Sequence, residues 1–231
     1  MLKTAYVVPT RGRPKNAERL LKAWEDTKAV ADLYFVCDSD DWALRDYEKI
    51  DGINILINYH TATGMVEPLN MAVMTLLDDS KYDRYDFFGF MGDDNVPRTP
   101  YWDYLLRLLL PLGRNGIAYG NDLLQGANVP TSCLMTRGIC EQLKGMVPGT
   151  LKHLYADNFW KVLGTDLGNL QYNHDIVIEH MHPLARKAPM DDHYARVNSR
   201  EYYDHDEKAF KAYIDGQDYK DLVASVSGRM A

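Results

Sequence analysis

The sequence predicts one α/β domain, a mostly parallel sheet flanked by helices, with a helical tail at the C-terminus. Its 231 residues are enough for one large domain. Apolar runs alternate with segments of helical periodicity through the first half, which is typical of a parallel sheet covered by helices. Polar clusters follow three of these runs directly, at 9–13, 38–41 and 92–95. In parallel sheets such loops meet at one edge, where ligands bind.

The first half of the chain supplies the parallel strands. A β-branched and aromatic run at 4–8 predicts the first strand. Turn residues separate it from a helix expected over 15–26, where Leu20, Leu21 and Trp24 share one face. Apolar runs predict further strands at 33–37, 53–57 and 86–91, and Leu69, Val73, Leu76 and Leu77 recur at helical spacing.

The second half is less regular. Patterns there predict strands at 116–119, 132–136 and 176–179, and helices at 101–110, 157–163, 204–214 and 217–226. Charged residues and tyrosine dominate from residue 186 onward. We therefore expect a catalytic domain over 1–185 and a C-terminal helical extension over 186–231 that packs on it.

Composition excludes several classes of protein. Hydrophobic residues make up 46% and charged residues 26%, values typical of globular proteins and not of disordered or collagen-like chains. No apolar run reaches membrane-spanning length, and the first residues are typical of a strand, so we expect a cytoplasmic protein without a membrane partner. The net charge of −7 disfavours electrostatic wrapping of nucleic acid, although the basic first 28 residues can face an anion. The three cysteines lack zinc-site spacing.

The most informative motif is Gly92-Asp93-Asp94-Asn95, which ends an apolar strand. Two carboxylates and an amide place hard oxygen ligands at the sheet edge, where Mg²⁺ or Mn²⁺ can bridge them to a diphosphate. The alternative is a solvated acidic turn, because Asp and Asn are common turn residues.

Three segments together resemble GT-A glycosyltransferases, especially the family 2 type, which include short stand-alone and phage-borne enzymes. They are Pro9-Thr10-Arg11-Gly12-Arg13, Phe35-Val36-Cys37-Asp38 and the motif at 92–95. The resemblance implies that Asp38 contacts the base or ribose and that Asp93, Asp94 and Asn95 lie at the ribose and metal. It also places the first loop near the nucleotide, through Pro9, Thr10, Arg11 and Arg13. The third motif position is Asn instead of Asp, and an amide oxygen binds a divalent cation more weakly than a carboxylate.

The resemblance extends to Glu179-His180-Met181-His182, which follows a late predicted strand. Many metal-dependent GT-A enzymes supply a further metal ligand here. His180 and His182 share a face on an extended strand, and one of them is enough for this role. An imidazole ligand would favour Mn²⁺ over Mg²⁺. The alternative is a surface histidine pair at a strand end.

Two further acidic residues complete the candidate site. The segment around Asp157 resembles the one that carries the catalytic carboxylate of inverting family 2 enzymes, so Asp157 would accept the proton of the acceptor hydroxyl. Alternatively, Asp157 only caps the helix that follows. Asp122, in the loop after another predicted strand, either binds donor-sugar hydroxyls or belongs to a simple turn.

Together these features predict a metal-dependent transferase that moves a hexose or pentose from a nucleoside diphosphate sugar, with UDP-sugars as the first candidates, to an acceptor hydroxyl. The implied cofactor is Mn²⁺ or Mg²⁺. A sugar nucleotidyltransferase is disfavoured, because 9–13 holds the single glycine Gly12 and lacks the glycine-rich GxGxR pattern that lets a backbone approach phosphate closely. A non-catalytic module that binds sugar nucleotides or glycans is a second alternative. The acceptor stays open between a DNA base, a protein and a glycan.

Overall fold

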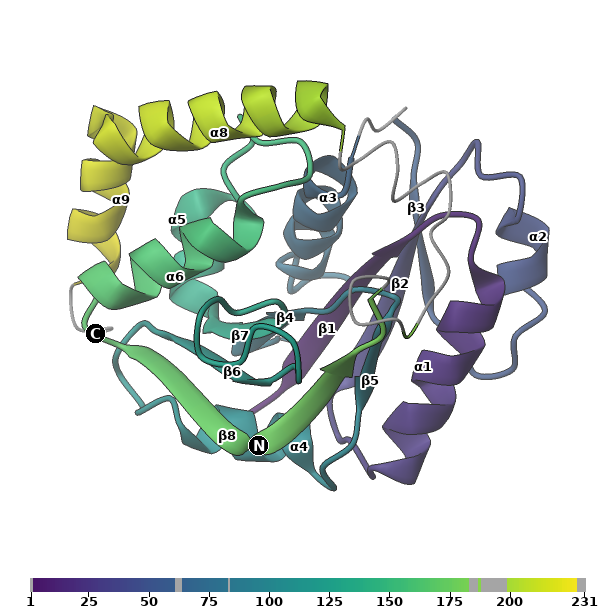
Figure 1. Ribbon diagram of the computed structural model, residues 1–231. Coiled ribbons are helices and arrows are strands. Elements are labelled where there is room, and N and C mark those ends of the chain that lie inside the picture. The colour runs from purple at the N-terminus through teal and green to yellow at the C-terminus, as the bar shows by residue number, and fades with distance from the viewer. Residues whose placement is uncertain (1, 61–63, 83, 183–186, 188–198, 228–231) are drawn as a thin grey trace.

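The computed structural model describes residues 2–60, 64–82, 84–182, 187 and 199–227. In this part of the chain eight strands form one curved sheet in the order β3-β2-β1-β4-β7-β6-β8-β5, with helices on both faces (Figure 1). The strands are β1 (Thr4–Thr10), β2 (Asp32–Asp38), β3 (Ile55–Asn58), β4 (Phe87–Phe90), β5 (Asn95–Pro97), β6 (Ile117–Asn121), β7 (Cys133–Thr136) and β8 (Leu170–His180). The helices are α1 (Pro14–Asp26), α2 (Leu44–Tyr47), α3 (Val66–Leu76), α4 (Trp102–Leu108), α5 (Arg137–Leu143), α6 (Ala156–Asp166), α8 (Arg200–Asp215) and α9 (Gln217–Val226).

The two halves of the sheet differ in strand direction. Strands β1 to β4 are mutually parallel, as the sequence predicts. Strand β7 runs antiparallel to β4 and β6, and β5 runs antiparallel to β8, while β6 and β8 are parallel. The predicted α/β class is confirmed, and the carboxyl ends of β1, β2 and β4 lie at one edge of the sheet, as expected.

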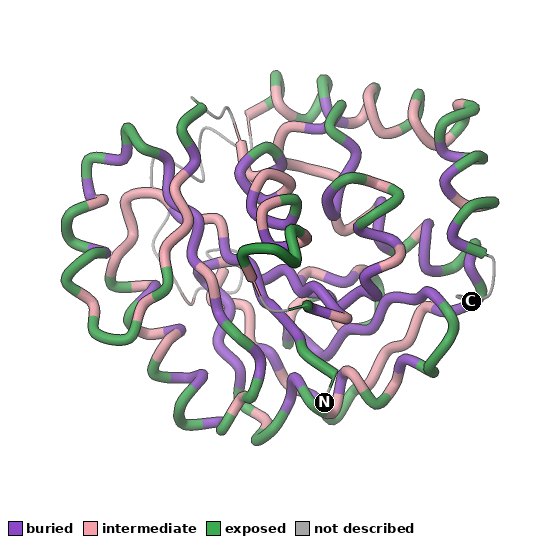
Figure 2. The backbone as a smooth tube through the Cα atoms, turned by 180° about the vertical axis from the view of Figure 1, so that it is seen from behind, coloured by how far each residue is buried: buried purple, intermediate pink, exposed green. Residues whose placement is uncertain are grey.

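Strand alternation divides the core between the two faces of the sheet. In β1, Ala5 and Val7 point to the face covered by α3 and α6, whereas Tyr6 and Val8 point to the face covered by α1 and α4. On the second face Tyr6 meets Trp24 and Trp102 edge to face, with ring centroids 5.4 and 4.8 Å away. The central strands are buried along their length (Figure 2). Because the central strands are buried on both faces, their carboxyl ends are held in fixed positions.

The C-terminal helices pack against α5 and α6 (Figure 1). Tyr219, Leu222 and Val226 of α9 belong to the same hydrophobic core as α3 and α6. The hydroxyl of Tyr219 donates to Asp166 Oδ2 at 2.6 Å. The expected boundary between 185 and 186 lies outside the described residues, so the division into two domains stays a prediction.

Candidate active site

A cavity of about 300 Å³ opens at the carboxyl ends of β1, β2 and β4. That volume falls at the small end of the range for ligand pockets. Every candidate residue from the sequence except Asp122 lines it: Pro9, Thr10, Arg11, Arg13, Asp38, Asp93, Asp94, Asn95, Asp157, His180 and His182. Five separate segments therefore converge on one space.

The end of β1 is joined to the acidic motif by a buried hydrogen-bond network. Thr10 Oγ1 donates to Asp93 Oδ2 at 2.7 Å, and the Arg13 guanidinium lies 3.3 Å from Asp93 Oδ1. The Tyr47 hydroxyl lies 2.9 Å from Thr10 Oγ1 and accepts the backbone N–H of Arg13 at 2.7 Å. Sequence reasoning missed Tyr47, because α2 reaches β1 only through the tertiary fold. The network fixes the loop proposed to face the nucleotide.

The end of β2 forms a second polar group. Arg11 Nη1 donates to Asp38 Oδ2 at 2.9 Å, and Asn58 Nδ2 donates to Asp38 Oδ1 at 2.9 Å. Asn58 faces Asp38 because β3 pairs with β2 in parallel at this register. Asp41, another residue that the sequence did not single out, accepts the Gly12 N–H at 2.9 Å. Asp38 is thus oriented on both oxygens beside the cavity.

Strand pairing explains how the acidic motif meets the late histidine. Asn95 lies opposite His180 in the antiparallel β5–β8 pair, and the Met181 N–H donates to the Asp94 carbonyl at 2.8 Å. These contacts place His180 Nε2 at 3.3 Å from Asp94 Oδ2. The three-residue strand β5 was not expected from the sequence, yet it produces the convergence that the metal hypothesis requires.

A side chain at the first position of the turn at 92–95 would displace the carboxylate of Asp94. A Cβ on Gly92 would lie 2.6 Å from Asp94 Oδ1 and 3.2 Å from Asn95 Oδ1. Asn95 Oδ1 accepts the Gly92 N–H at 2.8 Å, which closes the turn. Asn95 Nδ2 is buried and finds no hydrogen-bond partner within the described residues. A ligand oxygen would satisfy this donor.

The charges around Asp93, Asp94 and His180 favour a bound cation. Burial and the negative charge of Asp94 raise the pKa of Asp93 to about 6, against the opposing effect of Arg13. Burial alone would lower the pKa of His180, but Asp122 and Asp94 raise it to about 9. Burial and the neighbouring His180 lower the pKa of His182, whose ring centroid lies 4.9 Å from that of His180. A cation beside Asp94 would relieve the repulsion between these carboxylates.

Asp122 lies behind His180 and outside the lining of the cavity. Its Oδ1 accepts the backbone N–H groups of Leu124, Gln125 and Gly126 at 2.7–2.9 Å, and its Oδ2 accepts the Thr131 hydroxyl at 2.9 Å. His180 Nδ1 lies 3.8 Å from Asp122 Oδ2, which is an ion-pair distance and too long for a hydrogen bond. Direct binding of donor hydroxyls by Asp122 stays a prediction.

Asp157 lies in the first turn of α6 and does not occupy the N-cap position. The N-cap is Tyr155, with φ at 63°, and Asp157 Oδ1 accepts the N–H of Asn158 at 2.9 Å. Burial raises the pKa of Asp157, which this hydrogen bond only partly offsets. Asp157 is thus not the N-cap residue, but its side chain does satisfy one first-turn N–H of α6, so both its proposed role as a base and the helix-start role stay predictions. A half-buried carboxylate of raised pKa at the cavity wall is suited to accept a proton.

Asp94 and His180 fit a divalent cation whose coordination is completed by a bound substrate. No group of three or more His, Cys, Asp and Glu side chains that could hold an ion by themselves occurs among the residues that the structure describes. Asp94 Oδ2 and His180 Nε2, 3.3 Å apart, have the spacing of two adjacent ligands of one octahedral ion, about 3 Å for bonds near 2.1 Å. Mg²⁺ is often held by one or two carboxylates together with substrate phosphates.

Searches by sequence return nothing: no protein-family model matches the chain, and no curated protein matches it. Solved structures do share its fold. A mutant of Drosophila β-1,4-galactosyltransferase 7, in complex with manganese, UDP-Gal and xylobiose, has a TM-score of 0.51 at 14% identity over 87% of this chain and 81% of that one. Glucosyl-3-phosphoglycerate synthase from Mycobacterium tuberculosis, in complex with Mn²⁺, UDP and phosphoglyceric acid, has a TM-score of 0.55 at 13% identity over 80% and 73%.

The chain has the GT-A nucleotide-sugar transferase fold. A 4-diphosphocytidyl-2C-methyl-D-erythritol synthase also resembles it, with a TM-score of 0.53 at 14% identity over 85% of this chain and 98% of that one. At these identities the likeness establishes the fold and leaves the reaction open, because one fold hosts different chemistries. The function has to be inferred from the site.

Proposed function

We propose that the chain is a divalent-metal-dependent glycosyltransferase that moves a sugar from a nucleoside diphosphate sugar, with UDP-sugars as the first candidates, to an acceptor hydroxyl. One observation carries the proposal: Asp94 and His180 lie 3.3 Å apart in the cavity that Asp38 and Asp157 also line. Two candidate cation ligands, a polar group at the end of β2 and a half-buried carboxylate thus border one space, an arrangement suited to transfer from a sugar nucleotide.

The nucleotide half of the proposed site comprises the loop after β1 and the end of β2. Asp38, with both oxygens oriented, would accept hydrogen bonds from the base or ribose. Arg11 keeps about a third of its side chain exposed, at 31%, and would face the diphosphate. Pro9 and Thr10 would contact the nucleotide through the backbone and the hydroxyl, and Arg13 and Asp93 would hold that loop against the acidic motif.

Asp94 and His180 would hold the Mn²⁺ or Mg²⁺ ion, with Asn95 and His182 as the further candidates beside them. An ion bound there would neutralise the charge that develops on the departing diphosphate. Asp122 would act through His180, because it places a carboxylate behind Nδ1 while Nε2 faces Asp94. At 3.8 Å the carboxylate would raise the basicity of the ring through its charge, and a hydrogen bond that also orients the ring would need a small approach.

Asp157 would accept the proton of the acceptor hydroxyl as that oxygen attacks the anomeric carbon. Its raised pKa, caused by burial, makes it a stronger base than an exposed aspartate. A base that acts on an attacking acceptor favours inversion of anomeric configuration. The acceptor itself could be a DNA base, a protein or a glycan. Among the described residues no helix could cross a bilayer.

The test is a thermal-shift and hydrolysis panel with UDP-glucose, UDP-galactose, UDP-N-acetylglucosamine and GDP-mannose, each with Mn²⁺ or with EDTA. A donor that binds the folded state raises the melting temperature. We expect one donor to stabilise the protein and to be hydrolysed slowly, both only with Mn²⁺.

Other outcomes decide between the alternatives. Donor binding without hydrolysis or transfer would indicate a binding module. Formation of a UDP-sugar from UTP and a sugar 1-phosphate, without hydrolysis of any donor, would indicate a nucleotidyltransferase. No binding of any sugar nucleotide would refute the proposal.

A further inference from the structure

Asp206 of α8 joins the C-terminal helices to the wall of the cavity. Its carboxylate is fully buried and accepts three consecutive backbone N–H groups: Lys152 to Oδ1 at 3.0 Å, and His153 and Leu154 to Oδ2 at 2.9 and 2.7 Å. The side chain of His205 adds a contact of 2.7 Å from Nδ1 to Asp206 Oδ1. Successive N–H groups that converge on one anion fix the backbone that carries them.

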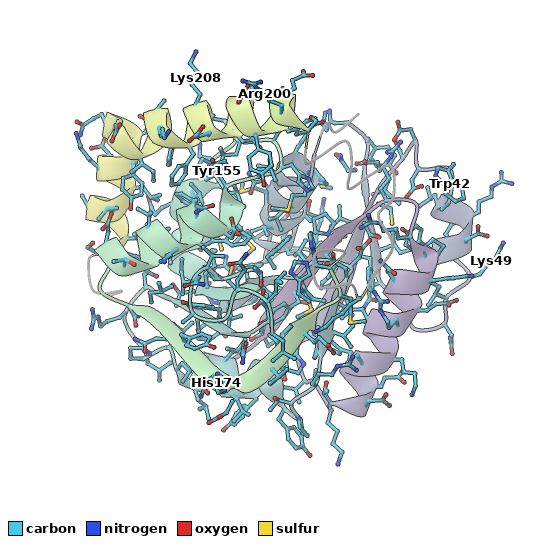
Figure 3. All side chains as sticks on the ribbon, in the orientation of Figure 1. Trp42, Lys49, Tyr155, His174, Arg200 and Lys208 are labelled. Carbon is cyan, nitrogen blue, oxygen red and sulfur yellow. The ribbon has the colours of Figure 1, made fainter. Side chains whose placement is uncertain are left out.

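The same helix supports the next residue of this loop. The Tyr155 ring packs on Phe210 and Tyr203 of α8, with centroids 5.4 and 6.5 Å away, and lies between α6 and α8 (Figure 3). Tyr155 adopts φ 63°, a conformation that is unfavourable for a residue with a Cβ and persists only where its surroundings hold it. Its carbonyl accepts the Phe159 N–H at 2.9 Å, so this strained residue starts α6.

The N-terminal end of α3 holds the loop from the opposite side. The Val66 N–H donates to the Lys152 carbonyl at 3.1 Å, and a Cβ on Gly64 would lie 2.2 Å from that oxygen. The loop is therefore fixed between α3 and α8. Its residues His153, Leu154 and Tyr155 line the cavity, and Asp157 follows two residues later.

We propose that Asp206 is a positioning residue: through the N–H groups of 152–154 it sets the start of α6 and thereby the place of Asp157 in the cavity. This inference rests on the proposed function, in which Asp157 is the base. It assigns the C-terminal extension a part in the reaction, although none of the described residues of α8 and α9 lines the cavity.

The test variant is Asp206→Asn, and Asp204→Asn on the same helix is the control. Asn keeps one acceptor oxygen and replaces the other with an NH₂ group, which must face a backbone N–H of the loop or His205. Within the part of the chain that the structure describes, Asp204 makes only an exposed contact with Arg200 at 3.5 Å. With the UDP-sugar that the wild type hydrolyses fastest, Asp206→Asn should lower kcat roughly 10- to 100-fold, the effect of a small misplacement. Donor Kd should stay within about twofold, because the nucleotide half is untouched.

Amide hydrogen exchange measures how firmly the loop is held, independently of enzyme activity. Exchange at 152–160 should rise in Asp206→Asn and stay unchanged in Asp204→Asn. If Asp206→Asn does not fold, Phe210→Leu replaces it, since this change weakens the packing on Tyr155 and leaves the hydrogen bonds of Asp206 in place.

Each remaining outcome counts against a definite part of the proposal. Unchanged hydrogen exchange at 152–160 in the folded variant would refute the role of Asp206 in fixing this loop. Faster exchange with unchanged kcat would refute its role in positioning the base. A wild type that turns over no sugar nucleotide would refute the proposed function and the catalytic role of Asp206 with it, whereas hydrogen exchange would still show whether Asp206 holds the loop at 152–154.

Discussion

Replacing Asp122 with alanine tests whether one carboxylate organises the region behind His180. The change removes the acceptor of three backbone N–H groups and of the Thr131 hydroxyl. Hydrogen bonds to a charged group contribute about 1.5 to 3 kcal/mol each, but Gln125 is exposed and its neighbours are half-buried, so water can replace part of the loss. At about 1 kcal/mol for each of the four donors, Asp122→Ala should lower the free energy of unfolding by about 4 kcal/mol.

Urea unfolding followed by tryptophan fluorescence measures this change. Asp122→Asn keeps one acceptor oxygen for the loop and should lose only about 1 kcal/mol. If His180 binds the cation, both variants should also bind Mn²⁺ roughly 10-fold more weakly in the presence of UDP, because the carboxylate behind His180 Nδ1 is lost. A loss of stability below about 1 kcal/mol in Asp122→Ala would refute the role of the carboxylate in the loop. Unchanged Mn²⁺ affinity in both variants would separate Asp122 from the cation site.

Three further predictions concern the base, the nucleotide and pH. Asp157→Asn should lower hydrolysis of the best UDP-sugar by about 100-fold at unchanged donor Kd, and near-normal kcat would remove Asp157 as the base. Asp38→Ala should weaken UDP binding by about 1 to 3 kcal/mol in calorimetry, and unchanged affinity in the folded variant would exclude it from the nucleotide site. Burial tends to raise the pKa of Asp206, but the hydrogen bonds from His153 and the loop lower it overall. Its stabilisation is therefore complete above the unfolded pKa of about 3.9 and is lost as pH falls through the folded value, so the stability gap to Asp206→Asn, measured in urea, should be constant near neutral pH and shrink below about pH 4.

Much of the fold and of the site follows from local sequence signals. The strand at 4–10 and the helix after it are marked by β-branched residues, turn residues and apolar periodicity, and both occur where expected. Because the carboxyl ends of parallel strands share one edge, polar residues after separate strands were bound to meet, as Thr10 and Asp93 do.

Other features depend on contacts between distant segments and leave no local signal. The three-residue strand β5 is too short to produce a pattern, yet its pairing with β8 sets the distance between Asp94 and His180. Asp206 lies within the periodic pattern of α8 like any polar helix residue, and only the packed structure shows the three N–H groups that it accepts. The position of Asp122 beside His180 is tertiary as well, whereas its hydrogen bonds to the N–H groups of Leu124, Gln125 and Gly126 are local to the turn.

In the proposed function, Asp94 and His180 hold a divalent cation that binds the diphosphate of the donor. The most direct measurement is a crystal structure with UDP and Mn²⁺, with anomalous diffraction recorded at the manganese edge. We expect an anomalous peak about 2.1 to 2.2 Å from Asp94 Oδ2 and His180 Nε2, in contact with the diphosphate. UDP bound in the cavity with no anomalous peak near Asp94 would contradict the metal-dependent mechanism, while the fold assignment would stand.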